Sequence, residues 1–171
     1  MIELVRISPE YRRHLFEMMD EWTATGEKIV PFALRKVDYH DFEAFCAELD
    51  KMERGEVEGR VPSTTLFAID TESDIFVGAV NIRHYLDDYM LNYAGHIGDG
   101  VRPSERRKGY ATEMIRLALE ECRKLGISRA LMVCDKTNIG SAKSIINNGG
   151  VLENEIELED GEIDQRYWID I

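Results

Sequence analysis

The sequence has 171 residues, a formal net charge of −12, 44% hydrophobic residues and 32% charged residues. This length and composition suit one globular domain, 1–171, and exclude a disordered chain. The acidic balance excludes a general nucleic-acid binder, which needs a basic face, and no apolar run reaches the length of a membrane span. The N-terminus lacks a signal-peptide pattern, so we expect a cytoplasmic protein with Cys46, Cys122 and Cys134 as reduced core thiols.

Hydrophobic periodicity and turn residues predict two helices and four strands in the first part of the chain. The expected elements are a strand at 2–7, a helix at 9–22 with Ser8 as its N-cap, a helix from the N-cap Asp38 to Arg54, and strands at 64–69, 75–83 and 94–101. Loops are expected at 25–31 and 55–63, and a polar connection at 86–93. The strands at 64–69 and 75–83 are almost continuously apolar, which indicates that both of their faces are covered.

The clearest helix begins after Gly109 and ends at Gly126, which suits the C′ position. Three further elements follow it: a buried strand at 130–134, expected to run parallel to 94–101; a helix at 139–148; and a hairpin of 151–158 and 162–170 around Asp160-Gly161. The fold class is therefore α/β, with a mixed sheet in a single domain.

A basic loop immediately precedes this clearest helix. It contains Arg102, Arg106, Arg107 and Lys108, and Gly109 leaves room for a close approach to the backbone. A helix start exposes N–H groups without intrahelical acceptors at the positive end of the helix dipole. The loop could be no more than a solvated surface, but its position favours a phosphate or pyrophosphate site.

Other phosphate and metal motifs are absent. Gly98-Asp99-Gly100 could begin a dinucleotide fingerprint, but Pro103 occupies the third glycine position. The sequence contains no Gly-x-x-x-x-Gly-Lys-Ser/Thr loop, no His-Glu-x-x-His and no Cys-x-x-Cys, so neither a nucleoside triphosphatase nor a metal site is indicated.

The segment Arg106-Arg107-Lys108-Gly109-Tyr110-Ala111 resembles the Arg/Gln-x-x-Gly-x-Gly/Ala motif of the GCN5-related N-acetyltransferase (GNAT) superfamily. The preceding Val101-Arg102-Pro103 resembles that family's strand-to-loop junction. Asn138, with Ser141 and Gly149 after it, resembles the later helix of the family. The element order agrees over most of the chain, and the specific resemblance covers about 95–150.

The resemblance implies a mostly antiparallel sheet with a splayed parallel pair, 94–101 and 129–134, and flanking helices. It also implies acetyl-CoA as co-substrate, with the pyrophosphate on the 106–111 loop, the pantetheine arm along the strand before it, and the Val101 N–H polarising the thioester carbonyl. The implied cofactor-binding residues are Asp99, Gly100, Val101, Arg106, Arg107, Lys108, Gly109, Tyr110, Ala111, Thr112, Asn138 and Ser141.

Acetylation of a lysine-like amine requires loss of a proton, at a cost of roughly 4–5 kcal/mol at neutral pH. Many family members carry a tyrosine seven residues after the Asn to protonate the leaving thiolate, but here that residue is Ile145. The candidate catalytic residues are therefore Asp99, Ser141 and His96. Each has an alternative: Asp99 could mark a β-bulge, Ser141 could be a simple first-turn hydroxyl, and His96 faces away from Asp99 by strict alternation.

The acceptor is expected to be a small cationic primary amine, acetylated by direct transfer in a ternary complex. Tyr85, Tyr89 and Tyr93, with Asp87 and Asp88 between them, are either a polar connection or a wall for such a cation. Ile145 also keeps open a catalytically weak acyl-CoA-binding module, and a nucleotide-binding regulator is the third hypothesis. A homodimer is compatible with all three.

Overall fold

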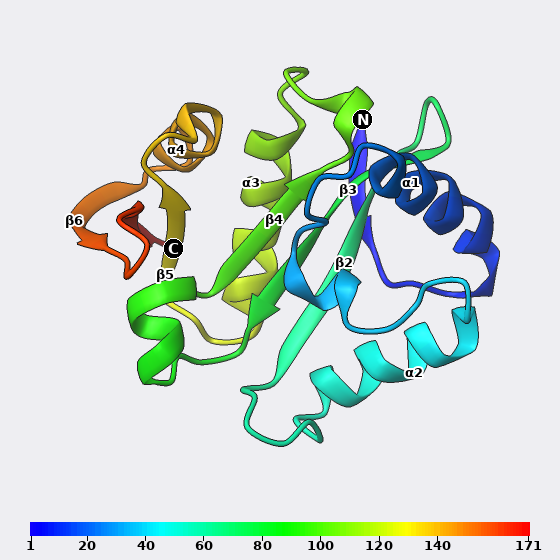
Figure 1. The fold of residues 1–171 in the computed structure, drawn as a ribbon, viewed down its shortest axis with the longest axis horizontal. Helices are drawn as coiled ribbons and strands as arrows, with labels where there is room; N and C mark the ends of the chain where they lie inside the picture. Colours follow the sequence, from blue (N-terminus) through cyan, green and yellow to red (C-terminus); the bar gives the residue numbers. More distant parts are fainter.

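The computed structural model describes all 171 residues and contains two antiparallel sheets (Figure 1). The first has the order β1-β2-β3-β4, formed by Ile2–Val5, Ser63–Asp70, Ile75–Arg83 and Ile97–Val101. The second has the order β5-β7-β6, formed by Arg129–Asp135, Ile163–Asp170 and Val151–Glu157. The predicted chain order of helices and strands is confirmed.

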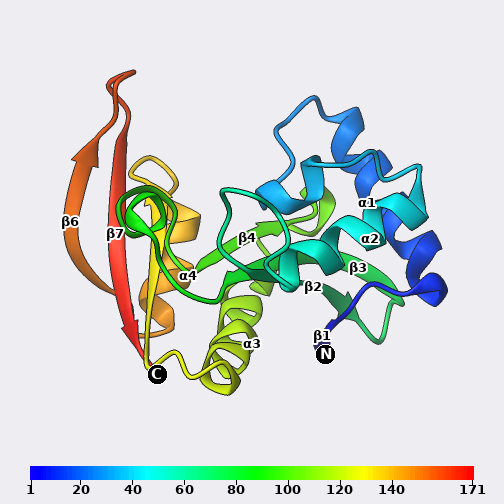
Figure 2. The same ribbon diagram turned by 90° about the horizontal axis from the view of Figure 1, so that it is seen from below.

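Helices cover both faces of the first sheet (Figure 2). On one face lie α1, Arg12–Ala24, and α2, Phe42–Glu53, and on the other lies α3, Tyr110–Lys124. The helix α4, Ile139–Asn147, packs against α3 and β5. Strand β3 supplies side chains to two separate cores, which explains its continuously apolar sequence.

The helix α3 has the ends that the sequence predicts. Gly109 is its N-cap with φ +86°, and Gly126 follows its last turn with φ +78°, both values that favour glycine. Its stripe of Met114, Ile115 and Ala118 is fully buried against the first sheet. Burial of this stripe fixes the position of the helix start relative to β4.

One predicted N-cap is wrong, and the other precedes a 3₁₀ turn instead of an α-helix. The Asp41 carboxylate, not that of Asp38, caps α2, because it accepts the Ala44 N–H at 3.1 Å. Asp38 instead accepts the N–H of His40 at 3.0 Å and closes the preceding turn. Ser8 is the N-cap residue before Pro9, as expected, but the element that it precedes is a 3₁₀ turn at 9–11 that leads into α1, and its side chain makes no cap hydrogen bond.

Two boundaries and the burial of one cysteine also differ from the expectation. The connection at 86–93 runs into a π-helical turn, Met90–Ala94, so β4 begins only at Ile97. In the hairpin the Leu158 N–H donates to the Glu162 carbonyl, which makes the loop one residue longer than a two-residue turn. Cys46 is only half-buried, whereas Cys122 and Cys134 are free and buried as expected.

The two sheets meet at a single point between β4 and β5. Gly95 and Met132 form an isolated bridge of antiparallel type, and the His96 N–H donates to the Leu131 carbonyl at 2.7 Å. Beyond this point β4 and β5 run in the same direction and diverge, with α3 connecting them (Figure 1). The expected splayed pair is therefore present, and the outer edge of β4 has no strand partner.

No helix in the structure combines the length and the apolar character needed to cross a bilayer.

Candidate functional site

A cleft of about 880 Å³ opens where β4 and β5 diverge. Its walls are the end of β4, the loop and first turn of α3, and the first two turns of α4, with Trp22 and Val30 closing one side. All the implied cofactor-binding residues except Lys108 line it. The sequence singled out β4, the α3 loop and Asn138, and the fold brings these three segments together.

Unpaired backbone donors gather at the start of α3. None of the N–H groups of residues 107–112 donates to an acceptor within the chain. Arg107 (φ +62°) and Gly109 (φ +86°) both adopt left-handed conformations in this turn. A left-handed arginine costs about 1–2 kcal/mol, a strain of the kind found at ligand-binding turns. Together with the helix dipole, these unpaired donors create a local positive field that suits an anion.

Two of the four basic side chains in the loop pair with acidic residues on the α1 side of the molecule. Arg102 is 13% exposed and its Nε donates to Glu21 at 2.5 Å. Arg106 donates to Glu27 at 2.6 Å and lies over the ring of Trp22. Both arginines therefore tie the loop to the α1 side of the molecule, and of the two only Arg106 also lines the cleft.

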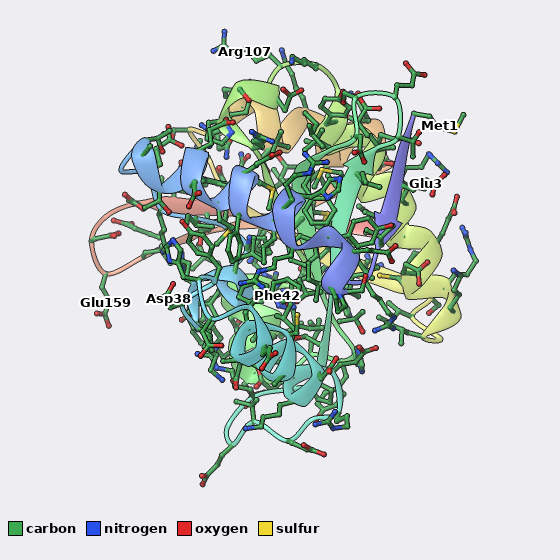
Figure 3. All side chains as sticks on the ribbon, turned by 90° about the vertical axis from the view of Figure 1, so that its right-hand side faces the viewer. Met1, Glu3, Asp38, Phe42, Arg107 and Glu159 are labelled. Atoms are coloured by element: carbon green, nitrogen blue, oxygen red, sulfur yellow. The ribbon has the colours of Figure 1, made fainter.

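The other two basic side chains remain closer to solvent. Lys108 pairs with Glu105 at 2.8 Å and is half-exposed. Arg107 makes no ion pair and projects away from the ribbon (Figure 3). Arg107 is thus the one cation of the loop without an internal partner, and the backbone N–H groups supply the rest of the positive field.

We expect Arg107→Ala to weaken acetyl-CoA binding and Arg102→Ala to lower the stability of the fold. Loss of the exposed Arg107 should weaken acetyl-CoA binding about fivefold, less at high salt, with little change in stability. Loss of Arg102 leaves the partly buried Glu21 without its cation and should cost about 1–2 kcal/mol of unfolding free energy. Calorimetric titration and urea unfolding of both variants measure this. Equal affinities in wild type and Arg107→Ala would remove this side chain from the site.

The open edge of β4 presents backbone groups to the cleft. The Arg102 N–H donates to the Val77 carbonyl at 2.8 Å, and the Arg83 N–H donates to the His96 carbonyl at 2.7 Å. Hydrogen-bonded pairs alternate along an antiparallel ladder. The N–H groups of Asp99 and Val101 therefore point away from β3, toward the side where β5 has diverged.

The Asp99 side chain lies on the α3 face of the sheet, because its ladder partner Val80 belongs to that core. It lines the cleft, and burial raises the pKa of its carboxyl group to about 6. No cation is paired with it. A carboxylate with this pKa is half-ionised just below neutral pH and can accept a proton from a bound amine.

On the opposite face of β4, Val30 and Trp22 pack directly against the backbone of Gly100. A Cβ atom there would lie 2.2 Å from the Val30 carbonyl oxygen and 2.8 Å from the Trp22 ring, so no other residue fits. The buried indole Nε1 of Trp22 has no hydrogen-bond partner. Sequence periodicity assigned Trp22 to the core of α1, and nothing in the pattern indicated that its ring also borders the cleft.

His96 does not line the cleft. Its Nδ1 accepts the Leu131 N–H at 2.9 Å, and burial lowers the pKa of its ring to about 4. His96 is thus a neutral acceptor at the junction of the two sheets, and this position does not suit a base for the amine. Nowhere do three His, Cys, Asp or Glu side chains lie close enough together to hold a metal ion.

The start of α4 forms the far wall of the cleft. The side-chain amide oxygen Oδ1 of Asn138 accepts the Ser141 N–H at 3.1 Å and caps the helix. The Ser141 hydroxyl lies beside the Cys134 thiol, whose pKa burial raises to about 11. Ile145 is fully buried in the core and does not face the cleft. Ser141, in the first turn of α4, places its hydroxyl group in the lining of the cleft.

The tyrosine-bearing segment before β4 does not border the cleft. Tyr85, Tyr89 and Tyr93 are exposed, by 56%, 62% and 46%. The Asp87 carboxylate accepts the Met90 N–H at 2.8 Å and so caps the π-helical turn. The expected wall for a cation is not formed at this cleft.

A profile of the family described as the acetyltransferase (GNAT) domain matches residues 2–151. No curated protein sequence matches the chain at a significant level.

Solved structures share the fold at low sequence identity. A microcin self-immunity acetyltransferase, MccE, in complex with acetyl-CoA and AMP has a TM-score of 0.72 at 18% identity, covering 99% of this chain and 92% of its own. The ribosomal-protein alpha-N acetyltransferase RimL in complex with coenzyme A has a TM-score of 0.72 at 13% identity, covering 99% and 94%. A spermidine N-acetyltransferase chimera, SpeG from Vibrio cholerae with hSSAT, has a TM-score of 0.66 at 13% identity, covering 99% of this chain and 95% of its own.

Proposed function

Because this chain belongs to the GNAT acetyltransferase family, whose enzymes use acetyl-CoA as the acetyl donor, we propose that it acetylates a primary amine by direct transfer in a ternary complex. One observation carries the proposal. Unpaired N–H groups at 107–112 and the open edge of β4 border the same cleft. We further propose that residues 1–171 act as one catalytic domain, since β4 of the first sheet and α4, which packs against β5 of the second sheet, both line the cleft.

In this proposal the pyrophosphate of acetyl-CoA binds the N–H groups at the start of α3, with Arg107 beside it. The pantetheine arm hydrogen-bonds along β4 at Asp99 and Val101, as an added strand would. The Val101 N–H then lies where the thioester oxygen gains negative charge during attack, and it stabilises that charge. The first turn of α4, with Asn138 and Ser141, closes the site from the other side.

The chemistry requires two proton transfers. The neutral amine attacks the thioester carbonyl carbon, the carbon–sulfur bond breaks, and the amide and the coenzyme A thiol are formed. Asp99 takes the proton that the amine loses, directly or through one water molecule. Ser141 is the donor we assign to the departing thiolate, since the aliphatic side chain of Ile145 has no acidic proton; the hydroxyl regains its proton from water in the cleft. Trp22, Val30 and the bare backbone of Gly100 form the side from which the acceptor approaches.

The test is release of coenzyme A thiol from acetyl-CoA in the presence of an amine panel, with mass spectrometry of the products. The panel includes a polyamine, amino acids, an aminoglycoside and peptides with free N-termini. This range is chosen because the enzymes that share the fold include a protein acetyltransferase and a spermidine acetyltransferase. We expect thiol release only with an amine present, and one acetyl group added to it. Tight acetyl-CoA binding with no turnover on any amine would instead support a binding module.

A further inference from the structure

A second pocket, of about 260 Å³, lies under the loop between α1 and α2. Three arginines, Arg35, Arg60 and Arg83, line it together with neutral residues, and its lining contains no aspartate or glutamate. None of the three forms a salt bridge anywhere in the structure. In a chain with 33 acidic and 21 basic residues, such a concentration of unpaired positive charge needs a cause.

Of the three arginines, Arg83 is the one whose burial costs the fold most free energy. Its Nη1 is fully buried and has no hydrogen-bond partner. Burial, helped by the nearby charge of Arg60, lowers the pKa of its guanidinium to about 10, so it still carries a proton at neutral pH. The guanidinium lies over Gly98, where a Cβ atom would be 3.1 Å from Nη1. A buried unpaired charge destabilises a fold unless a ligand provides its partner.

The other two arginines are held in position by the same ring. The guanidinium carbons of Arg60 and Arg35 lie 4.4 Å and 5.1 Å from the centre of Phe32. Arg35 also donates to the Ile29 carbonyl at 3.1 Å. These contacts fix two positive charges beside Arg83 without neutralising them. The arrangement is preorganised for an anion of small size.

The pocket lies next to the face of β4 from which we expect the acceptor to approach. Gly98, beneath Arg83, and Gly100, beside Val30, are two residues apart on the same face of the strand, a separation of about 7 Å. The connecting loop borders both cavities, with Val30 at the cleft and Phe32 at the second pocket. We propose that this pocket binds the carboxylate or phosphate group of the small amine that the enzyme acetylates.

This inference rests on the proposed acetyltransferase function and adds the substrate class. The acceptor is then an amine that also carries an acidic group, about 7 Å or more from its nitrogen. The exposed tyrosine segment fits this assignment in part, because Tyr89 lines the second pocket rather than the cleft.

Matched amines test the proposal. Aminovalerate is compared with pentylamine, and aminopropyl phosphate with aminopropanol, at saturating acetyl-CoA. We expect at least about tenfold higher kcat/KM for one or both acidic amines, and the two pairs distinguish carboxylate from phosphate. Arg83→Gln and Arg60→Gln should raise KM for the acidic amine while leaving KM for acetyl-CoA unchanged. Arg123→Gln, an equal charge change on exposed α3, should alter neither.

A binding measurement separates this inference from the function it rests on. With coenzyme A filling the first cleft, inorganic phosphate should raise the melting temperature of wild type and Arg123→Gln, but not of Arg83→Gln. Turnover on uncharged and acidic amines at equal kcat/KM would overturn the anion pocket and keep the acetyltransferase. Phosphate binding lost in Arg83→Gln, without turnover on any amine, would keep the pocket and overturn the amine acceptor.

Discussion

Gly109→Glu should lower the affinity for acetyl-CoA by about 100-fold or more, the largest binding effect that we expect from any single substitution. The side chain would enter the space in front of the unpaired N–H groups at the start of α3, where a Cβ atom on residue 109 would have no protein atom within 4 Å. A carboxylate there repels the pyrophosphate and occupies its donors. The substitution also places a side chain at φ +86°, which should cost about 1–2 kcal/mol of stability.

Gly126→Glu is the matched control for this variant. Gly126 has φ +78°, its Cβ position is equally open, and it lies at the other end of the same helix. The strain and the added charge are therefore the same, but the cleft is untouched. Isothermal calorimetry with acetyl-CoA and thermal unfolding of both variants decide the question. Similar affinities in the two variants would show that the cofactor does not use the α3 start.

The cofactor cleft was predictable from the sequence because its parts are local. The α3 start combines a glycine with positive φ, an amphipathic helix and a preceding strand within one continuous segment. Asn138 is a helix cap with its own local signature. Each of these signals acts over a few residues, and the fold only has to bring the β4 end and the α4 start together.

The roles of individual charges were not predictable, because they depend on partners distant in the sequence. Arg102 and Arg106 look like anion ligands until the fold brings Glu21 and Glu27 to them. Arg35, Arg60 and Arg83 form no motif in the sequence, since each lies in a different segment. Only the packing of these segments around Phe32 and Gly98 creates the second pocket.

The ends of the helices and strands were also not predictable from the sequence, for a physical reason. Asp38 and Asp41 are equally good N-caps by residue type, and the choice depends on the turn between them. The same holds for β4, where the strict alternation that put His96 and Asp99 on opposite faces cannot foresee that the strand begins at Ile97. His96 therefore pairs with the backbone of β5 instead of facing a ligand.

Asp99→Asn should reduce kcat by a factor of about 100 or more and at the same time make the protein more stable. Asparagine keeps the size of the side chain but cannot accept the proton of the amine. The wild-type carboxyl has its pKa raised from 3.8 to about 6 by burial, so its ionised form opposes folding. Removing that charge should stabilise the fold by on the order of 2 kcal/mol at neutral pH.

The raised pKa of Asp99 also predicts how the stability and the activity of the wild type change with pH. Between about pH 4 and pH 6 the unfolded chain loses this proton before the folded protein does, so wild-type stability should fall as the pH rises through that window. Asp99→Asn should lack this fall, and the two melting temperatures should converge near pH 4. The kcat/KM of the wild type should rise with pH as Asp99 ionises near pH 6, and the pH profile of the variant should lack this rise.

Asp50→Asn, an exposed carboxylate on α2, is the control, and should change neither the pH profile nor the melting temperature by much. The pair of readouts separates a catalytic carboxylate from a structural one. A structural role for Asp99 predicts that both activity and stability fall together in Asp99→Asn. A catalytic base held in a buried site predicts that activity falls while stability rises, because the low-dielectric surroundings that raise the pKa toward the working range also oppose the charge. An unchanged kcat would exclude Asp99 as the base, whatever the stability does.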